Sequence, residues 1–248
     1  MKPLNSSLLL ASLLAGLAGC ASAHDASHAG GIASRASKAV QAPFDIVHTR
    51  ISTEGNIAIF HMAVSGTAGA ARPARSGRLA GSAVFSYVWP TSMDPSVVGF
   101  EPKAGILAFA VTAHPDFDDT PLFDENGDGD PANDGAGWHS HWVVLGEDAA
   151  CAGGLKVRDV SPGQDLLPDT APGLPIALDS PGMSPLIAGS TVRITVPVAG
   201  AENVNFDAVA ARLKVNAEGK APLLCVTGTY KVASGKLTLP GVVVKQAK

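Results

Sequence analysis

Hydrophobic and polar residues alternate over short stretches along most of this chain, and this pattern is typical of β-strands rather than of helices. Gly, Pro or Asp residues bound most of the stretches, which keeps each one at strand length. Residues 205–215 fit either a short helix or a strand, because Phe206, Val209 and Leu213 keep helical spacing. The predicted strands are 44–51, 56–64, 82–89, 105–112, 139–145, 190–198, 223–232 and 236–244.

The composition favours the same fold class. The chain has 27 Gly and 18 Pro, with 46% hydrophobic residues, so it combines many turns with enough apolar surface for a packed core. We therefore predict an all-β protein: a single antiparallel β-sandwich over residues 43–248, with a long acidic loop and a Pro- and Gly-rich loop at 161–189. Neither an internal repeat nor a second domain is evident.

The N-terminus has the features of a secretory signal. A basic residue, Lys2, is followed by an apolar run at 8–17 that is too short to span a bilayer. The run ends in Leu-Ala-Gly-Cys at residues 17–20, which resembles the lipobox of bacterial lipoproteins at every position. We therefore assign residues 1–19 to a signal peptide.

The resemblance to the lipobox implies that Cys20 is acylated and begins the mature chain. Ala21 after the cysteine resembles the pattern of lipoproteins sorted to the outer membrane, so the predicted location is its periplasmic face, with the membrane as partner through the lipid anchor. The alternative is cleavage after Ala23, which would leave a soluble periplasmic protein. Residues 20–42 are rich in Ala, Ser and Gly and are predicted to be a flexible tether.

Two cysteines remain, Cys151 and Cys225. In an oxidising compartment they are expected to form one disulfide. A metal site built on them is the alternative, although the CxxC spacing of such sites is missing.

Carboxylates and histidines are concentrated between Lys103 and Lys156. This stretch has ten Asp and Glu, three His and no Lys or Arg. The net charge of the chain is −4 and the stretch contributes −10, so the rest carries +6. Because close carboxylates repel each other unless a cation offsets them, the stretch predicts a cation site.

Residues 124–135 resemble the opening of a calcium-binding loop of the EF-hand and dockerin kind. Asp124, Asn126 and Asp128 occupy loop positions one, three and five, and Gly129 occupies the turn at position six. The twelfth position, where an acid is expected, is Gly135, so Asp134 would have to complete the calcium site. A solvated acidic turn is the alternative.

His139 and His141 are separated by one residue on a predicted strand, so both imidazoles point to the same face. Their Cα atoms would then lie about 6–7 Å apart, which suits one transition-metal ion. The flanking Trp138 and Trp142 would face the core. His114 is the first choice for a third ligand and would allow zinc or copper. The candidate metal ligands are His114, Asp116, Asp118, Asp124, Asn126, Asp128, Asp130, Asp134, His139 and His141.

The predicted function is that of a non-catalytic cell-envelope lipoprotein that binds a divalent metal through residues 114–141. One alternative is a metal-dependent hydrolase that uses His114, His139 and His141. Another is a structural or adhesion module stabilised by calcium. HExxH, GxSxG and P-loop motifs are missing from the sequence, which disfavours the common hydrolase and nucleotide sites. The lack of a basic cluster disfavours nucleic acid as a partner, and the sequence does not identify a protein partner.

Overall fold

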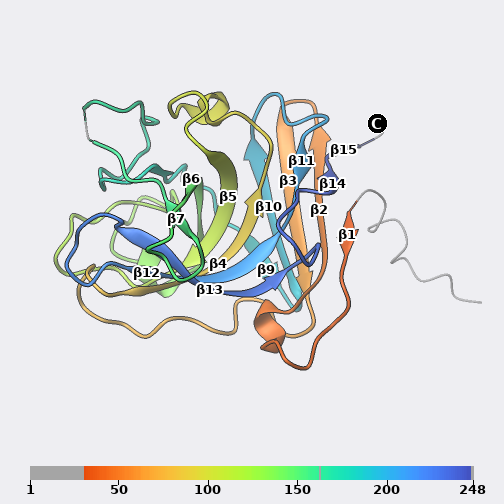
Figure 1. Ribbon diagram of the computed structural model, residues 1–248, viewed down its shortest axis with the longest axis horizontal. Coiled ribbons are helices and arrows are strands. Elements are labelled where there is room, and N and C mark those ends of the chain that lie inside the picture. The colour runs from red at the N-terminus through yellow and green to blue at the C-terminus, as the bar shows by residue number, and fades with distance from the viewer. Residues whose placement is uncertain (1–30, 162, 247–248) are drawn as a thin grey trace, which may run out of the picture.

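The computed structural model describes residues 31–161 and 163–246, and this part of the chain is built almost entirely from antiparallel β-strands (Figure 1). No α-helix occurs in it, and the helical turns are three short 3-10 helices at Ala42–Phe44, Pro95–Val98 and Asp134–Ala136. The predicted all-β class is therefore confirmed.

Six strands form a closed barrel. They follow one another around the ring in the order β5, β4, β12, β13, β7 and β6, and the pairing of β5 with β6 closes it. These strands are β4 (Ala83–Pro90), β5 (Ile106–Ala113), β6 (His139–Glu147), β7 (Leu155–Val157), β12 (Val209–Val215) and β13 (Leu224–Val232).

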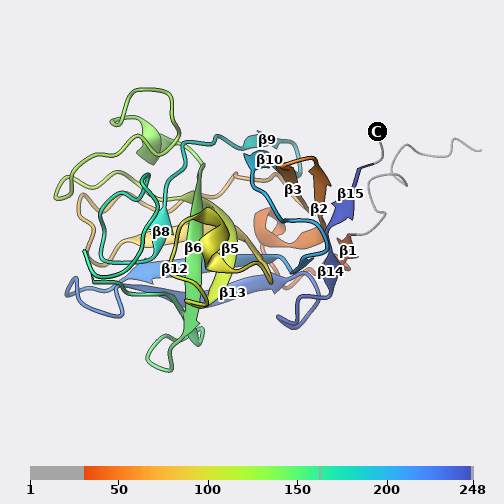
Figure 2. The same ribbon diagram turned by 90° about the horizontal axis from the view of Figure 1, so that it is seen from above.

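A six-stranded sheet stands beside the barrel, at the right of Figure 1. Its strands are β1 (Ile32–Ala33), β2 (Ile46–Glu54), β3 (Ile57–Val64), β9 (Leu186–Ala188), β10 (Thr191–Pro197) and β15 (Val244–Lys245). The short β8 (Leu178–Asp179) pairs with β6, and β11 (Asn205–Phe206) pairs with β14 (Gly241–Val242). In Figure 2 the loop that joins β5 to β6 lies at the end of the barrel where β6 begins.

The protein has two hydrophobic cores because the barrel wall is buried on both sides. On β5, Phe109 and Val111 belong to the core between barrel and sheet, whereas Ala108 and Ala110 belong to the core inside the barrel. A strand buried on both faces needs apolar residues at every position. This explains the nearly continuous apolar run at 105–112.

Aromatic rings join the sheet to the barrel. Phe60 on β3 lies with its ring centre 4.8 Å from that of Phe109, 5.6 Å from Trp89 and 6.0 Å from Trp142. Phe109 and Trp142 also meet edge to face at 4.8 Å. Such pairs add to the free energy of burying the rings, so this cluster holds the two layers together.

Most of the predicted strands are present. Seven correspond to β2, β3, β4, β5, β6, β10 and β13, and residues 205–215 form β11 and β12 rather than a helix. The prediction of a continuous strand at 236–244 is wrong, since only the short β14 and the start of β15 lie there. The closed ring is also a feature that the predicted sandwich did not contain, and the Pro- and Gly-rich stretch at 161–189 includes β8 and β9.

Part of the predicted tether lies against the domain. Ile32 and Ala33 of β1 pair with Thr49 and His48 of β2. The backbone N–H of Ser37 donates a hydrogen bond to the Asp45 carboxylate. Ile32 and Ala33 thus extend the sheet, whereas the predicted signal peptide and Cys20 lie outside the described residues.

The predicted disulfide between Cys151 and Cys225 is confirmed. It links the turn between β6 and β7 to β13, with the two Cα atoms 5.2 Å apart. The bond therefore ties the two strands that flank β7 in the barrel. None of the described helices is long and apolar enough to cross a membrane.

A buried ion pair connects the barrel to the segment before β2. Lys231 Nζ lies 2.8 Å from Asp45 Oδ1, and the Asp45 side chain is only 1% exposed. Burial by itself raises the pKa of Asp45, but hydrogen bonds from Lys231, the Ser37 N–H and Ser65 outweigh it, so the pKa lies below its ordinary value. The carboxylate is therefore charged in the folded protein at neutral pH.

We predict that Asp45→Ala lowers the free energy of unfolding at pH 7 by about 1.5–3 kcal/mol, because Lys231 loses its charged partner. A carboxyl whose pKa is depressed in the folded state stabilises above the unfolded pKa of about 3.9 and loses this effect as the pH falls through the folded pKa. Denaturant titrations should therefore show the difference shrinking below about pH 4. Glu218→Gln, which changes the exposed pair with Lys220, is the control and should stay within about 0.5 kcal/mol of the parent.

Candidate metal centre

The pairing of β5 with β6 places three histidines on one face of the barrel wall. In the antiparallel register His139 lies opposite Thr112, and His141 lies opposite Ala110. His114 follows Thr112 by two residues and so continues the same face. Trp142 and Ser140 point to the opposite face, where Trp142 joins the core between barrel and sheet. The predicted division of β6 into a histidine face and a tryptophan face is confirmed.

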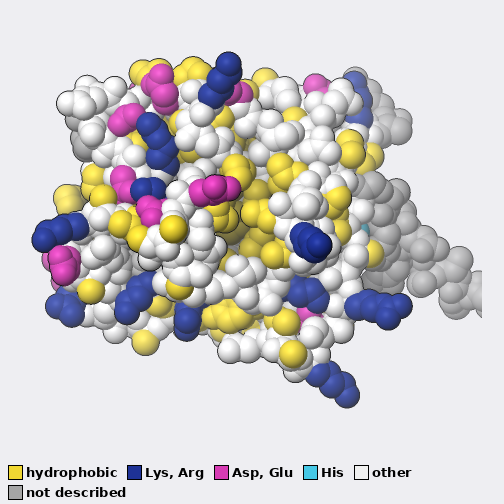
Figure 3. Space-filling view, viewed as in Figure 1, with side chains coloured by type: hydrophobic (Ala, Val, Ile, Leu, Met, Phe, Trp, Pro, Cys, Tyr) yellow, Lys and Arg dark blue, Asp and Glu magenta, His cyan; other side chains and the backbone are white. Residues whose placement is uncertain are grey.

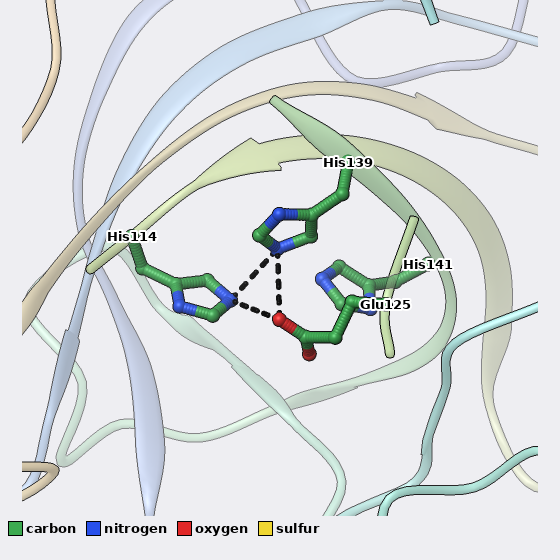
Figure 4. A group of neighbouring side chains, drawn as sticks. All are labelled: His114, Glu125, His139 and His141. Carbon is green, nitrogen blue, oxygen red and sulfur yellow. Dashed lines mark hydrogen bonds and ion pairs between the residues drawn. The ribbon is translucent and has the colours of Figure 1, made fainter. Parts of the chain in front are cut away.

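The three imidazoles converge with the carboxylate of Glu125 (Figure 4). Nε2 of His114 and Nε2 of His139 are 2.9 Å apart. Oε2 of Glu125 lies 3.3 Å from His139 Nε2 and 3.5 Å from His114 Nε2. Figure 4 shows one ring nitrogen of His141 turned toward the other three groups. One ligand atom from each residue lies within 4.8 Å of the others.

This spacing suits one metal ion. Two ligand atoms bound to a tetrahedral zinc at about 2.0–2.1 Å lie about 3.3 Å from each other. The separations of 2.9, 3.3 and 3.5 Å among the ligand atoms of His114, His139 and Glu125 bracket that value, and the His141 ligand atom lies within 4.8 Å of them. Among the described residues, His114, Glu125, His139 and His141 form the one group of three or more His, Cys, Asp or Glu side chains that could hold a metal ion.

Glu125 was not among the residues singled out from the sequence. It was passed over because it occupies the second position of the calcium-like motif, between Asp124 and Asn126, whose side chains carry the resemblance. The only signal was that Glu125 is the single Glu between His114 and His139. Its contribution depends on the path of a loop, which residue spacing does not define.

The acidic loop positions Glu125 through hydrogen bonds between its own carboxylates and its backbone N–H groups. The two carboxylate oxygens of Asp134 accept hydrogen bonds from the N–H groups of Glu125 and Asn126, both at 3.0 Å. Asp124 accepts from the N–H groups of Gly127 and Gly129, both at 2.8 Å. These carboxylates therefore act as turn-forming acceptors in the loop that carries Glu125.

Gly135 explains why the twelfth position of the calcium-like motif is not an acid. A Cβ atom there would lie 2.1 Å from the backbone nitrogen of Asp116 and 2.7 Å from its carboxyl carbon. The loop thus packs directly on the segment that follows β5, and only glycine fits. This contact brings the ends of the 114–138 connection together beside His114.

The remaining predicted ligands lie outside this group. Asp118 forms an exposed ion pair with Arg75, and Asp128 accepts hydrogen bonds from Asp130 N–H and the Asn133 side chain. Of the ten predicted ligands, the four-residue cluster contains His114, His139 and His141. The role of the loop residues in binding calcium stays a prediction.

Burial keeps the two strand histidines neutral. Removal from water, together with His114, lowers the pKa of His141 to about 3. Burial, then His114 and His141, lowers the pKa of His139 well below its ordinary value. Burial also raises the pKa of Glu125, and Asp134 and Asp116 raise it further, whereas His114 opposes this shift. Neutral imidazoles keep a lone pair free for a metal near neutral pH.

Ser180 orients His141. Because Asp179 of β8 lies opposite Trp142 of β6, the next residue, Ser180, lies beside His141. The Ser180 hydroxyl is 3.1 Å from His141 Nδ1 and donates to Glu125 Oε1 at 3.5 Å. With its proton directed at Glu125, the hydroxyl accepts from Nδ1–H, which leaves Nε2 of His141 as the ligand atom.

The cluster borders a cavity of about 370 Å³ inside the barrel. His114, Glu125 and His141 line this cavity, and most of its other walls are apolar side chains of the barrel strands. A metal ion bound by the cluster would therefore lie next to a largely apolar space inside the barrel.

We predict that Ser180→Ala weakens metal binding by about 10–100-fold, because His141 loses the partner that sets its protonated nitrogen. Competitive titration of zinc against a chelator measures this change. Ser140→Ala is the matched control: Ser140 donates to the Met183 carbonyl and anchors the same segment, but from the opposite face of β6. Equal losses in both variants would show that Ser180 only holds the segment in place.

Comparisons with known proteins add no assignment to this site. No family model matches the chain, and no match was found among the curated proteins or the solved structures. The conclusions about function therefore follow from the geometry of the cluster and its surroundings.

Proposed function

We propose that this protein binds one divalent transition-metal ion through His114, Glu125, His139 and His141. The observation that carries the proposal is the convergence of four ligand atoms within 4.8 Å, from two paired strands and one loop. Three of these residues were expected from the sequence, and with the buried Glu125 carboxylate they offer four ligand atoms to a metal that can also accept a fifth ligand.

The ligand types favour zinc or copper over calcium at this cluster. Three imidazole nitrogens with one carboxylate oxygen suit zinc, copper or a related first-row metal, whereas calcium takes six to eight oxygen ligands. Zinc is the metal to test first, because its preference for tetrahedral coordination matches four protein ligands.

The charge of the surroundings supports a bound cation. Glu125 is largely buried, and the residues that line the adjoining cavity include Asp116 but neither Lys nor Arg. A buried carboxylate needs a compensating partner, and the buried His139 and His141 are neutral. A divalent ion would supply the missing positive charge.

The wider role that we propose is that of a non-catalytic metal-binding lipoprotein of the cell envelope. The lipobox resemblance at residues 17–20 supports the anchor, and the disulfide between Cys151 and Cys225 supports an oxidising compartment. On the face drawn in Figure 3, Lys and Arg side chains lie mainly in the lower half. That the protein binds no nucleic acid stays a prediction.

A metal-dependent hydrolase is the second candidate, and the cavity beside the cluster favours it. Substrate could reach the metal from the cavity, and Asp116, which also lines it, could serve as general base. Ester, phosphate and peptide substrates tested with the zinc-loaded protein decide between the two roles. Turnover that disappears in Asp116→Asn would establish the hydrolase.

A structural or adhesion module stabilised by calcium is the third candidate, with the calcium bound by the loop at 124–134. Calcium-dependent melting that is lost in Asp128→Asn and kept in a His139→Ala/His141→Ala variant would establish it. Calcium at the loop is compatible with zinc at the cluster, because Asp128 lies outside the four-residue group.

We predict that the purified mature protein retains about one equivalent of transition metal, and that His139→Ala/His141→Ala abolishes this, because two of four ligands are lost. Mass spectrometry of metal content and the melting temperature with and without chelator are the measurements. His61→Ala is the matched control: His61 lies on β3, with its ring beside that of His48, and this variant should keep the metal. Unchanged metal content in the double variant would refute the proposal.

A further inference from the structure

We propose that the barrel interior binds a small apolar molecule that carries one carboxylate, and that this carboxylate is received by the metal ion at the cluster. This inference rests on the proposed function, because the metal supplies the positive charge that the ligand needs. The class of ligand follows from three features: the cavity inside the barrel, its charge, and its access to the surface.

The barrel interior contains an apolar cavity beside its packed side chains. Protein interiors are normally packed to the density of organic crystals, and an empty apolar cavity lowers stability. Here a volume of about 370 Å³ remains, within the range of small-molecule sites. Its apolar walls include Val84, Val88, Ala110, Val143, Ala211 and Leu213.

The cavity has a polar end and an apolar end. The cluster lies where β5 ends and β6 begins, and His114, Glu125 and His141 form part of the wall there. Farther along the barrel wall, Leu145 of β6 pairs with Val157 of β7, and both line the cavity. A molecule with one polar head and an apolar body matches this division.

The charge of the site selects a carboxylate as the head group. The acidic side chains that line the cavity are Asp116 and Glu125, and no Lys or Arg is among the lining residues, so without metal the lining offers an anion no Lys or Arg partner. A divalent ion held by three imidazoles and the Glu125 carboxylate leaves one net positive charge on the four-residue cluster itself, to which Asp116 does not belong. A single carboxylate neutralises this charge, whereas an ammonium head group would be repelled by the metal. The site therefore accepts an apolar anion only when it is loaded with metal.

Access to the cavity is apolar as well. Leu122 and Leu237 line the cavity, and their side chains are 50% and 37% exposed. The cavity thus reaches the surface between the acidic connection and the segment after β13. Large exposed apolar side chains at an opening are suited to the passage of an apolar body.

The test uses octanoate and the neutral 1-octanol as probes, with the mature protein in zinc-loaded and metal-free forms. Isothermal titration should show octanoate binding to the zinc form at least tenfold more tightly than to the metal-free form. Octanol should bind both forms alike, because it has the same apolar body without the charge. With cobalt(II) in place of zinc, octanoate should shift the visible absorption of the metal, and octanol should not.

A variant inside the barrel tests the location. Ala211 on β12 is 4% exposed and lines the cavity, but it is not one of the four ligands. Ala211→Phe should reduce octanoate affinity at least tenfold while one equivalent of zinc remains bound. Leu122→Ala, at the exposed opening, does not fill the barrel and should retain octanoate binding, so it guards against a general effect of substitution near the cavity.

The outcomes separate this inference from the proposed function. If zinc binds at one equivalent but octanoate does not bind, or binds equally without metal, the inference is overturned and the metal site stands. If no transition metal binds, both fail, because the carboxylate then has no positive partner. The comparison of zinc-loaded and metal-free parent protein requires no variant, so it decides the inference even if Ala211→Phe does not fold.

Discussion

The pairing of β5 with β6 is the interaction on which the rest of the structure depends. It closes the barrel, so the strands enclose an interior that an open sheet would not have. The same register sets His139 opposite Thr112 and His141 opposite Ala110, which turns the two imidazoles inward. A slip of one residue would exchange the faces of β6, placing Trp142 inside the barrel and both histidines against the aromatic core.

The cluster combines a buried carboxylate with neutral histidines beside apolar walls. Burial of this kind is unfavourable unless charges are compensated. Two residues orient the ligands of the cluster. Asp134 accepts a hydrogen bond from the backbone of Glu125, and Ser180 sets which nitrogen of His141 carries the proton. A site whose ligands are oriented in advance loses less entropy when it binds an ion.

The acidic connection between β5 and β6 positions Glu125, a role that its composition did not indicate. The carboxylate oxygens of Asp124 and Asp134 accept hydrogen bonds from backbone N–H groups, and Gly135 lets the loop pack on Asp116. Together these contacts deliver Glu125 to the three histidines. The acidic stretch contains the four-residue cluster, but most of its carboxylates shape the loop or face solvent.

The sequence by itself determined the strand-forming stretches, the disulfide partners and the shared face of His139 and His141, because alternation and cysteine counting depend on local rules. It did not determine barrel closure, since pairing between distant strands leaves no local pattern. Nor did it determine the choice of Glu125 over its acidic neighbours. That choice was decided by tertiary structure, because a loop residue is placed by hydrogen bonds and packing contacts that form only when β5, β6 and β8 lie side by side.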